Sequence, residues 1–413
     1  MPAIETPIQK TLAEAPATRT RRQLPPVAAF TGASLAFFGM YIAAGAPTPL
    51  FVLFQEQWAF PAWVLTIAFA TYAVGLLLAL LVAGSLSDHI GRRPVLIGAL
   101  VVELIAMVIF IFAPSIGWII AARAIQGIAT GAATSTFSAS IVELAPARYK
   151  RLGTLFGGLA PAGGLALGVL ATGVAVQFTV VPAVIVFTAL AVIMILGTLV
   201  AVFSAETVAR RPGAARSLIP RISIPLAAQR EFAASIPVYL GAWMLAGLYL
   251  ALAPSIIRGF FHIDSGLLNG TVAGLEPAAA AIAGLLIGGL TARRTTLIGG
   301  VTIFAGIVLT VAGITTASLP LLFAGSLVGG VGFGSSFSGA LRTIAPLAGT
   351  HQRAELFAAV YLVAYLAFGV PVIIAGQLIT PLGLLTTVVV YGAVIALVAI
   401  VGIIAQLRVA RIP

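Results

Sequence analysis

The chain has 413 residues, of which 61% are hydrophobic and only 8% are charged. Soluble domains carry roughly 25% charged residues, so this composition excludes a water-soluble fold. The absence of cysteine excludes disulfide bonds and thiolate chemistry. A net charge of +11 would suit a nucleic-acid-binding protein, but the positions of the basic residues give this charge another meaning.

Long apolar runs fill most of the sequence. Each is close to or above the roughly 18 residues that are typical of a membrane-spanning helix. We therefore predict an all-α membrane protein with twelve transmembrane helices. The 44 glycines agree with this prediction, because small residues let helices pack closely in lipid. The runs lie at about residues 27–54, 63–84, 95–112, 117–142, 153–176, 179–203, 233–256, 267–290, 297–314, 320–341, 355–379 and 384–407.

Polar segments divide the twelve runs into two sets. Residues 1–26 are rich in Pro, Ala, Thr and Arg and predict a cytoplasmic tail. The longest interior polar segment, 204–231, separates six runs from six and predicts a cytoplasmic linker. We therefore expect an N-terminal six-helix half at 27–203, a C-terminal six-helix half at 232–407 and a short cytoplasmic tail at 408–413.

The basic residues lie almost entirely on one side of the predicted membrane. With the N-terminus inside, 20 of the 22 Lys and Arg residues fall in segments on the inner side, and only Arg123 and Arg258 fall elsewhere. This asymmetry follows the positive-inside rule, by which cytoplasmic loops collect Lys and Arg. We therefore expect both termini to be cytoplasmic. The positive charge orients the chain in a lipid bilayer, and we expect no nucleic-acid partner.

A short polar turn, GSLSDHIGRRP at 84–94, connects the second and third runs. Gly84 permits close helix approach, and Asp88 could accept hydrogen bonds from a neighbouring helix N-terminus or pair with Arg92. Charged contacts of this kind hold one conformation and break in another, so the turn predicts a conformational latch. The alternative is an ordinary capped turn. The residues assigned to the latch are Gly84, Asp88, Gly91, Arg92 and Arg93.

Two ionisable residues lie inside the third and fourth runs. Arg123, Gln126, Thr130 and Thr134 follow one another at helical steps and share one helix face, which must contact protein or water. Glu103 lies at a similar depth, so Arg123 could pair with it or extend to the outer surface. Burial favours the neutral form of a carboxyl group, and Glu103 would change protonation when water reaches it. We predict that Glu103 takes part in proton coupling, with a static ion pair or a hydrogen-bonded structural acid as the alternative.

The fifth run contains GGLAPAGG at 157–164. Pro161 removes one backbone hydrogen bond and is followed by Gly163 and Gly164, so this segment predicts a kink in the helix. The alternative to a role in transport is a proline kink beside small packing residues.

The eighth run carries a second candidate for proton coupling. Glu276 lies near the middle of the predicted membrane and directly precedes Pro277. The proline frees a backbone carbonyl and predicts a broken, gating helix of the kind found in transporters. A hydrogen-bonded structural acid is the alternative for Glu276.

Matching landmarks recur in the two sets of runs. The turn at 84–94 has a degraded counterpart at 288–294, where Ala292 replaces the aspartate. We therefore expect two pseudo-symmetric six-helix bundles, as in transporters built from parallel repeats. An offset of 203 residues, without gaps, places Gly127 on Gly330, Gly131 on Gly334, Ser135 on Ser338, Lys150 on Arg353 and Gly173 on Gly376.

Several kinds of site are absent from the sequence. The three histidines lie in different loops and there is no cysteine, so we expect neither a metal site nor a nucleophilic active site. No phosphate-cradling loop with its lysine is present, which argues against an ATP-driven pump. We expect no cofactor and no enzymatic activity, and energy for transport would come from a gradient.

These motifs resemble those of the major facilitator superfamily, in particular its twelve-helix drug/proton antiporter group, over residues 27–407. The turn at 84–94 is similar to the family's loop between helices 2 and 3. In the family, the acidic residue of this loop helps hold the outward-open form against the start of helix 11, here Ala354–Phe357. The RAIQG sequence at 123–127 resembles the helix 4 motif of proton-driven antiporters, whose arginine is implicated in proton transfer, and the resemblance implies that Arg123 takes part in proton coupling. The proline and paired glycines of the fifth run look like part of the antiporter signature.

The resemblance also implies which residues line the substrate cavity, because helices 1, 4, 7 and 10 surround it in the family. Aromatic and hydroxyl groups at these positions suit a largely apolar small molecule. The residues are Tyr41, Gln126, Thr130, Tyr239, Trp243 and Ser338.

We therefore expect a secondary active transporter that works as a monomer in a bacterial inner membrane. Its expected activity is proton-coupled export of a small, partly hydrophobic drug or metabolite by alternating access. A proton symporter that imports an organic acid or a sugar is the alternative within the same class. A non-transporting membrane sensor or enzyme is the alternative outside it, and this alternative requires clustered catalytic side chains or an appended soluble domain.

Overall fold

The computed structural model describes residues 23–349 and 352–409, and the regular structure in these residues is entirely helical. Twelve segments are long and apolar enough to cross a membrane. Each begins and ends within seven residues of its predicted run, and the largest difference is at the start of the seventh span, at Leu226 instead of residue 233. The predicted all-α fold class is confirmed. The predicted tails fall mostly outside the described residues.

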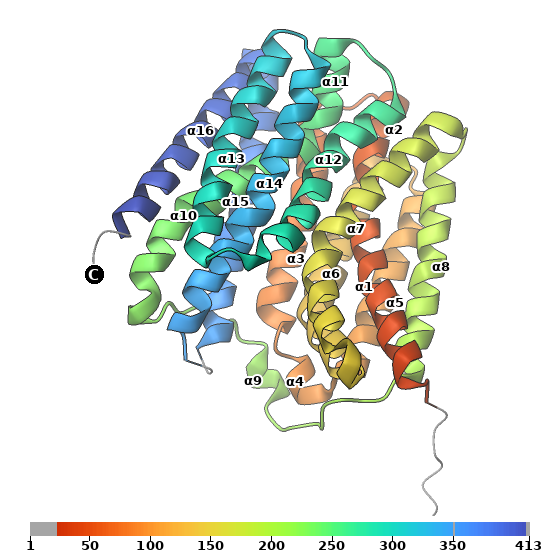
Figure 1. The fold of residues 1–413 in the computed structure, drawn as a ribbon. Helices are drawn as coiled ribbons and strands as arrows, with labels where there is room; N and C mark the ends of the chain where they lie inside the picture. The colour runs from red at the N-terminus through yellow and green to blue at the C-terminus, as the bar shows by residue number, and fades with distance from the viewer. Residues whose placement is uncertain (1–22, 350–351, 410–413) are drawn as a thin grey trace, which may run out of the picture.

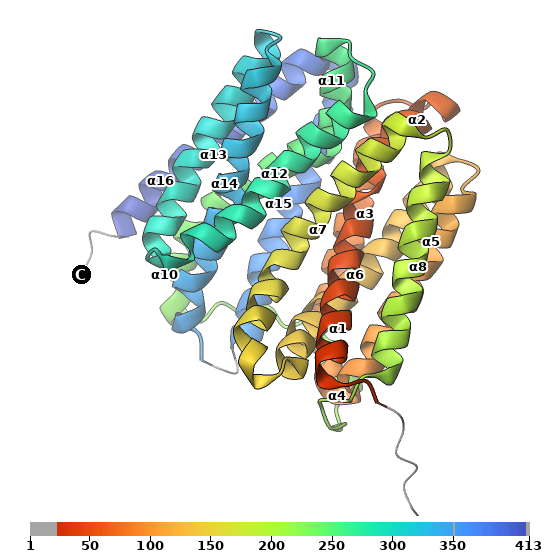
Figure 2. The ribbon, with the colours of Figure 1, turned by 45° about the vertical axis from the view of Figure 1, so that its right-hand side comes forward.

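The first six spans form one bundle, seen on the right in Figures 1 and 2. The first span consists of two helices separated by a break at Ala46. A four-residue helix, α4, lies in the turn after the second span. The helices are α1 Pro26–Gly45, α2 Pro47–Trp58, α3 Trp63–Ala83, α4 Ser87–Ile90, α5 Arg92–Phe112, α6 Ile116–Leu144, η2 Ala147–Tyr149, α7 Lys150–Phe178 and α8 Pro182–Phe203.

The last six spans form the second bundle, beside the first. Its first span is interrupted by a π-helical turn, η3. The short helix α9 lies in the segment that joins the bundles. The helices are α9 Ala214–Ser217, α10 Leu226–Gly247, η3 Leu248–Leu252, α11 Ala253–Phe261, α12 Gly266–Leu286, η4 Ile287–Gly289, α13 Ala292–Thr315, α14 Leu319–Ile344, η5 Ala345–Leu347, α15 Arg353–Leu382 and α16 Leu384–Val409.

Matching glycines make equivalent helix contacts in the two bundles. A Cβ atom at Gly127 of α6 would collide with the carbonyl oxygen of Tyr72 in α3. At the equivalent position in α14, a Cβ atom at Gly330 would collide with the carbonyl oxygen of Glu276 in α12. Only glycine allows the backbones to approach so closely. The repeat inferred from the sequence is therefore present in the packing.

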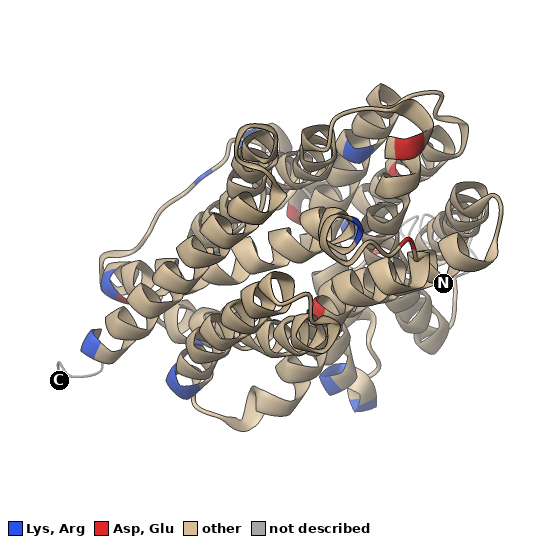
Figure 3. Cartoon of the chain, turned by 90° about the horizontal axis from the view of Figure 1, so that it is seen from above, with Lys and Arg blue, Asp and Glu red and all other residues tan. Residues whose placement is uncertain are grey.

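Different short helices and connections lie at the two ends of the molecule. We call the end with α4, α9 and the connecting segment the linker face, and the end with α2 and α11 the opposite face (Figure 1). Charged positions are sparse along the helices when the molecule is seen from above (Figure 3). The outward side of α8 is apolar, as expected for contact with lipid. Its exposed residues include Val184, Ile185, Val192, Ile195, Leu196 and Leu199.

Candidate functional site

A cavity of about 810 Å³ lies between the two bundles at the linker face. Its walls are formed by the linker-facing ends of α3, α6 and α15, the turn after α3 and part of the segment around α9. Because both bundles contribute to it, relative movement of the bundles would change its size. Its polar lining residues include Ser85, Asp88, Thr134, Ser138, Arg221 and Tyr361.

Close helix contacts join the two bundles toward the opposite face. In the contact between α7 and α12, a Cβ atom at Gly270 would lie 2.8 Å from the Gly173 Cα atom. In the contact between α3 and α15, a Cβ atom at Gly376 would collide with the side chain of Thr66. These two contacts are pseudo-equivalent, since offsets of 203 and 204 residues relate their members. The same small-residue packing therefore joins the bundles on two sides.

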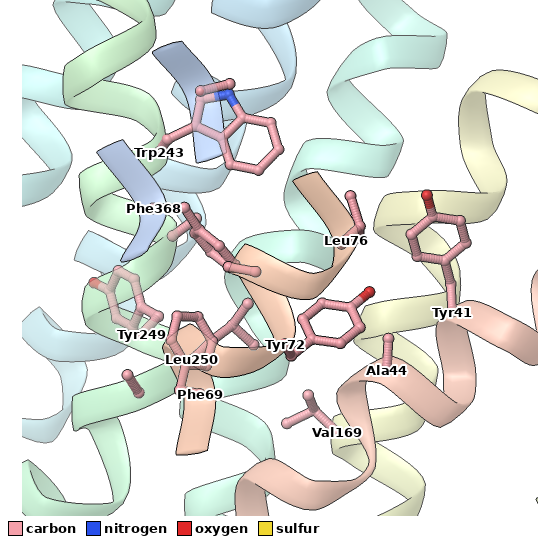
Figure 4. Packing of buried hydrophobic residues seen from close by; sticks show 14 of the residues in the cluster. Tyr41, Ala44, Phe69, Tyr72, Leu76, Val169, Trp243, Tyr249, Leu250 and Phe368 are labelled. Carbon is pink, nitrogen blue, oxygen red and sulfur yellow. The ribbon is translucent and has the colours of Figure 1, made fainter. Parts of the chain in front are cut away.

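An aromatic pair and an ion pair add to these contacts. The ring centroids of Phe69 in α3 and Phe368 in α15 lie 4.6 Å apart between the bundles, with the ring planes inclined by 58° (Figure 4). At the opposite face, the guanidinium of Arg258 pairs with the carboxylate of Glu56 in the other bundle, and also lies 3.5 Å from Asp264. In this conformation the bundles are therefore in contact toward the opposite face and separated by a cavity at the linker face.

The polar stripe of the fourth span faces the interior of the first bundle. Arg123, Gln126 and Thr130 are at most 2% exposed. The alternative in which Arg123 extends to the outer surface is therefore wrong. Its guanidinium carbon lies 4.2 Å from the centroid of the Tyr72 ring, a cation–π contact that sequence reasoning missed. Thr134 lines the cavity and shares a hydrogen bond of 3.0 Å with the Tyr41 hydroxyl.

Gln126 connects the two ionisable residues of this bundle. Its side-chain oxygen accepts a hydrogen bond of 2.5 Å from Arg123 Nη1, and its nitrogen donates one of 3.1 Å to Glu103 Oε1. No ion pair joins Arg123 directly to Glu103, so the predicted direct pairing is wrong. The reason is that the amide lies between the two groups and bonds to both. The structure brings together three of the predicted residues, with the glutamine as the bridge.

The break in the first span supplies further acceptors for this group. Pro47 has no N–H, so the carbonyl of Ala43, four residues earlier, loses its helical hydrogen bond. Gln126 Nε2 donates to this carbonyl at 2.9 Å, and Arg123 Nη1 donates to the next one, of Ala44, at 3.1 Å. The local sequence of the first span thus fixes the orientation of side chains from the fourth.

Two polar atoms of the group formed by Glu103, Gln126 and Arg123 lack a hydrogen bond. Glu103 Oε2 and Arg123 Nε are buried and have no hydrogen-bond partner among the described residues. Most buried polar atoms in folded proteins have a partner, so such exceptions often mark functional groups. A carboxyl group with one free oxygen can accept a proton there without breaking its existing hydrogen bond to Gln126.

The second predicted acid lies in α12 of the other bundle. Glu276 is 1% exposed, and its Oε1 atom has no partner in the described part of the chain. The helix continues through Pro277 from Gly266 to Leu286, so the predicted broken helix is wrong. The interruption is instead in the seventh span, at η3, where the Tyr249 hydroxyl bonds to Thr310 at 2.5 Å. This turn packs against α12, the helix that carries Glu276.

The turn at 84–94 is held by ion pairs and backbone contacts. Arg92 Nη1 lies 2.6 Å from Asp88 Oδ1 and donates to Ser87 Oγ at 2.6 Å. Arg92 Nη2 pairs with Glu143 of α6 at 3.2 Å. Asp88 lines the cavity, across which lies the start of α15, and makes no hydrogen bond or ion pair with it. The pairing with Arg92 is confirmed. The other predicted contact, with a helix N-terminus, is absent because the cavity separates the two.

A glutamate after the sixth span caps the helix that follows this turn. Glu206 accepts hydrogen bonds from the backbone N–H of Arg92 at 2.8 Å and of Arg93 at 3.1 Å. The Arg93 side chain donates to carbonyls at the end of α8. Gly91 has φ +98°, and a Cβ atom there would lie 2.5 Å from Glu206. Sequence reasoning missed Glu206 and Glu143, whose only signal was an acidic residue at the inner end of a span.

The predicted kink residues of the fifth span lie in a continuous helix. Pro161 is inside α7, which runs from Lys150 to Phe178 without a break. A Cβ atom at Gly164 would lie 2.5 Å from Tyr41 Cβ, and one at Gly163 would lie 3.2 Å from the Phe38 ring. The glycines therefore serve close packing of α7 against α1, which agrees with the alternative interpretation.

The predicted substrate contacts do not line the cavity in this conformation. Tyr41 meets it only through Thr134, while Gln126 and Thr130 are buried. Ser338 is half-buried and also lies outside the lining. Tyr239 and Trp243 belong to a cluster of rings behind Tyr361, whose side chain does line the cavity. In this conformation, depth along the helix decides which residues of these helices reach the cavity.

Comparisons with known proteins give the same fold. The xylose transporter XylE from E. coli, in a partially occluded inward-open conformation, has a TM-score of 0.69 at 14% identity, over 91% of this chain and 96% of XylE. A bacterial homologue of the human lysosomal transporter Spinster, inward-facing and occupied, has a TM-score of 0.72 at 12% identity, over 91% and 96%. A POT family transporter in complex with a thioalcohol-conjugated peptide has a TM-score of 0.72 at 13% identity, over 94% and 96%.

Sequence comparison identifies the family. No curated protein matches the chain. The family model described as the Major Facilitator Superfamily matches residues 33–309, which is well over half of the chain. The twelve spans, the two repeated bundles and the cavity between them agree with this match. The protein belongs to the Major Facilitator Superfamily and is a secondary transporter, not an enzyme.

Proposed function

We propose that the protein exports a small, partly hydrophobic compound in exchange for protons, by alternating access of a site between its two bundles. The observation that carries this proposal is the buried group of Glu103, Gln126 and Arg123, with one carboxylate oxygen left free. A buried carboxyl is neutral when shielded from water and ionises when water reaches it. Such a change is what proton coupling requires.

Polar side chains lead from the cavity toward this group. Thr134 lines the cavity, and its hydroxyl donates to the Thr130 carbonyl at 2.6 Å. The Thr130 hydroxyl donates in turn to the carbonyl of Gln126 at 2.9 Å, and Gln126 bonds to Glu103. These residues form a polar path along one face of α6. These hydroxyls are bonded to backbone carbonyls and do not relay a proton themselves, but water that enters along this polar face could carry one to the carboxyl from the linker face. The apolar contacts between the bundles shield the carboxyl from the opposite face.

The direction of the cycle follows from the orientation of the chain. The basic residues of the connecting segment and the adjacent loops favour a cytoplasmic linker face. The conformation described above would then be inward-facing, with its cavity open to the cytoplasm of a bacterial cell. The segment at 204–231 would link the two halves as they move. The motif of the fourth span, which resembles that of proton-driven antiporters, supports export.

Proteoliposomes test both the coupling and its direction. The reconstituted protein is given an imposed pH gradient and a panel of neutral and charged aromatic compounds, and proton movement is followed with a trapped pH-sensitive dye. Export requires that an added compound moves protons in the opposite direction, and movement in the same direction would establish a symporter instead.

Two variants then test the acids. Glu103→Gln and Glu276→Gln should lose pH-driven transport but retain exchange of substrate across the membrane. Glu231→Gln, at a half-buried position near the start of α10, is the matched control and should behave like the wild type. Normal coupling in both buried-acid variants would remove the proposed mechanism.

A further inference from the structure

A continuous cluster of seven aromatic rings runs from the cavity wall into the second bundle. Tyr361 lines the cavity, and its ring lies 6.2 Å from that of Tyr365 and 6.1 Å from that of Phe337. The ring of Trp243 lies 4.9 Å from Tyr365, and it also contacts Phe368 (Figure 4). The cluster consists of Tyr239 and Trp243 of α10, Phe333 and Phe337 of α14, and Tyr361, Tyr365 and Phe368 of α15.

Two polar atoms in this cluster have no partner. The hydroxyl of Tyr239 and the indole nitrogen of Trp243 are buried, and neither makes a hydrogen bond within the described residues. Tyr239 is 0% exposed and Trp243 is 9% exposed. An indole N–H can only donate, and a phenol hydroxyl donates readily. Buried donors without acceptors are uncommon in folded proteins. The cluster therefore lacks an acceptor that a ligand could bring.

The charge of the surroundings limits what this ligand can be. The seven rings include no ionisable group that is charged at neutral pH. The guanidinium of Arg123, in the other bundle, is already bound to Gln126 and stacked on Tyr72. The charged residues of the cavity lie outside the cluster: Asp88 in the turn after α3, Arg216 and Arg221 in the connecting segment, and Glu355 in the first turn of α15. Two unpaired donors disfavour a cation, and the lack of a basic side chain disfavours an anion.

We infer that the aromatic cluster is the substrate site and that it takes a neutral, planar aromatic compound with a carbonyl-type acceptor. The rings of the compound stack on the aromatic side chains. Its carbonyl oxygen accepts a hydrogen bond from Trp243, Tyr239 or both, after Tyr361 and Tyr365 rotate to admit it from the cavity. The inference rests on the proposed function, since it specifies the class of compound that the transporter carries.

Equilibrium binding to the purified full-length protein in lipid nanodiscs tests this inference without any gradient. Three planar probes of similar size separate the possible charges: coumarin is neutral with a lactone carbonyl, coumarin-3-carboxylate is anionic and N-methylquinolinium is cationic. Isothermal titration should show that wild-type protein binds coumarin more tightly than either charged probe. Equal or tighter binding of a charged probe, or no binding of coumarin, would overturn the inference, and this comparison needs no variant.

Variants that keep the rings test the two donors. Trp243→Phe and Tyr239→Phe each remove a donor, and the loss of one hydrogen bond should weaken coumarin binding by about two- to tenfold. Trp118→Phe is the control, because Trp118 is 53% exposed on α6 and lies outside the cluster. Unchanged binding in both donor variants would also overturn the inference.

The result is separable from the proposed function. If coumarin binds as expected but moves no protons in liposomes, the coupling fails while the site stands. If compounds move protons but coumarin does not bind, the site fails while the coupling stands.

Discussion

The contact between α7 and α12 offers a direct way to test alternating access, because it exists only while the bundles touch toward the opposite face. Gly270→Ala adds one Cβ atom that would lie 2.8 Å from Gly173 Cα and 3.0 Å from the Val169 carbonyl oxygen. Carbon atoms pack favourably from about 3.5 Å, so the helices must separate by about 0.7 Å. Both obstructing atoms belong to the backbone and cannot rotate away.

The size of the effect follows from the cost of overpacking. Inserting a methyl group into a well-packed contact costs about 1–3 kcal/mol. The cost falls on the conformation closed toward the opposite face and vanishes when α7 and α12 separate there. The equilibrium should therefore shift toward the alternative conformation by about 5- to 150-fold. Gly284→Ala, in the same helix, is the matched control because a Cβ atom there meets nothing within 4 Å.

Thiol labelling measures this shift. The chain has no cysteine, so a single introduced cysteine is the only thiol. Ser138→Cys reports on the cavity, which Ser138 lines, and Thr66→Cys reports on the closed contact, where Thr66 is 0% exposed. In the Gly270→Ala background, a membrane-impermeant maleimide should label Ser138→Cys more slowly and Thr66→Cys faster. Unchanged rates at both positions, or the same changes with Gly284→Ala, would refute the reasoning.

Two further predictions concern ion pairs. Asp88→Asn breaks the 2.6 Å pair with Arg92. Because this pair is partly exposed, we expect turnover in transport assays to fall by up to about fivefold while substrate affinity is retained. Unchanged turnover would favour a plain capped turn. Glu56→Gln removes the contact of Arg258 with the other bundle and should speed labelling at the opposite face. Asp264→Asn, which removes a contact of Arg258 within its own bundle, should have no such effect.

The spans and the repeat could be predicted because they depend on local features of the sequence. A run of about 20 apolar residues has few alternatives to a membrane helix. The matching glycines at 127 and 330 report close helix contacts that the structure contains. The buried face of the fourth span followed from its helical spacing, since lipid cannot solvate an arginine and a glutamine on one helix face.

The details of the site depended on contacts between distant segments. The bridge by Gln126 could not be predicted, because it requires the free Ala43 carbonyl from another span. Glu206 contacts the backbone of Arg92, from which it is separated by 114 residues of sequence, and no local sequence pattern predicts such a cap. The cavity lining also depends on which conformation the bundles adopt. A pattern of residue types does not contain this information.

The repeat relating the two bundles includes an interruption in the first span of each bundle. The break at Ala46 and the π-helical turn at 248–252 lie at equivalent positions, since an offset of 203 residues places 45–49 on 248–252. The first is linked to a buried acid, because the carbonyl of Ala43 binds Gln126, which bonds to Glu103. The second packs against α12, the helix that carries the buried Glu276. Prolines signal both interruptions: Pro47 follows Ala46, and Pro254, two residues after η3, leaves the carbonyl of Leu250 without its helical hydrogen bond. Interruptions of this kind free backbone groups and are frequent at functional sites. Their equivalence therefore argues that each bundle keeps a polar site at the same level.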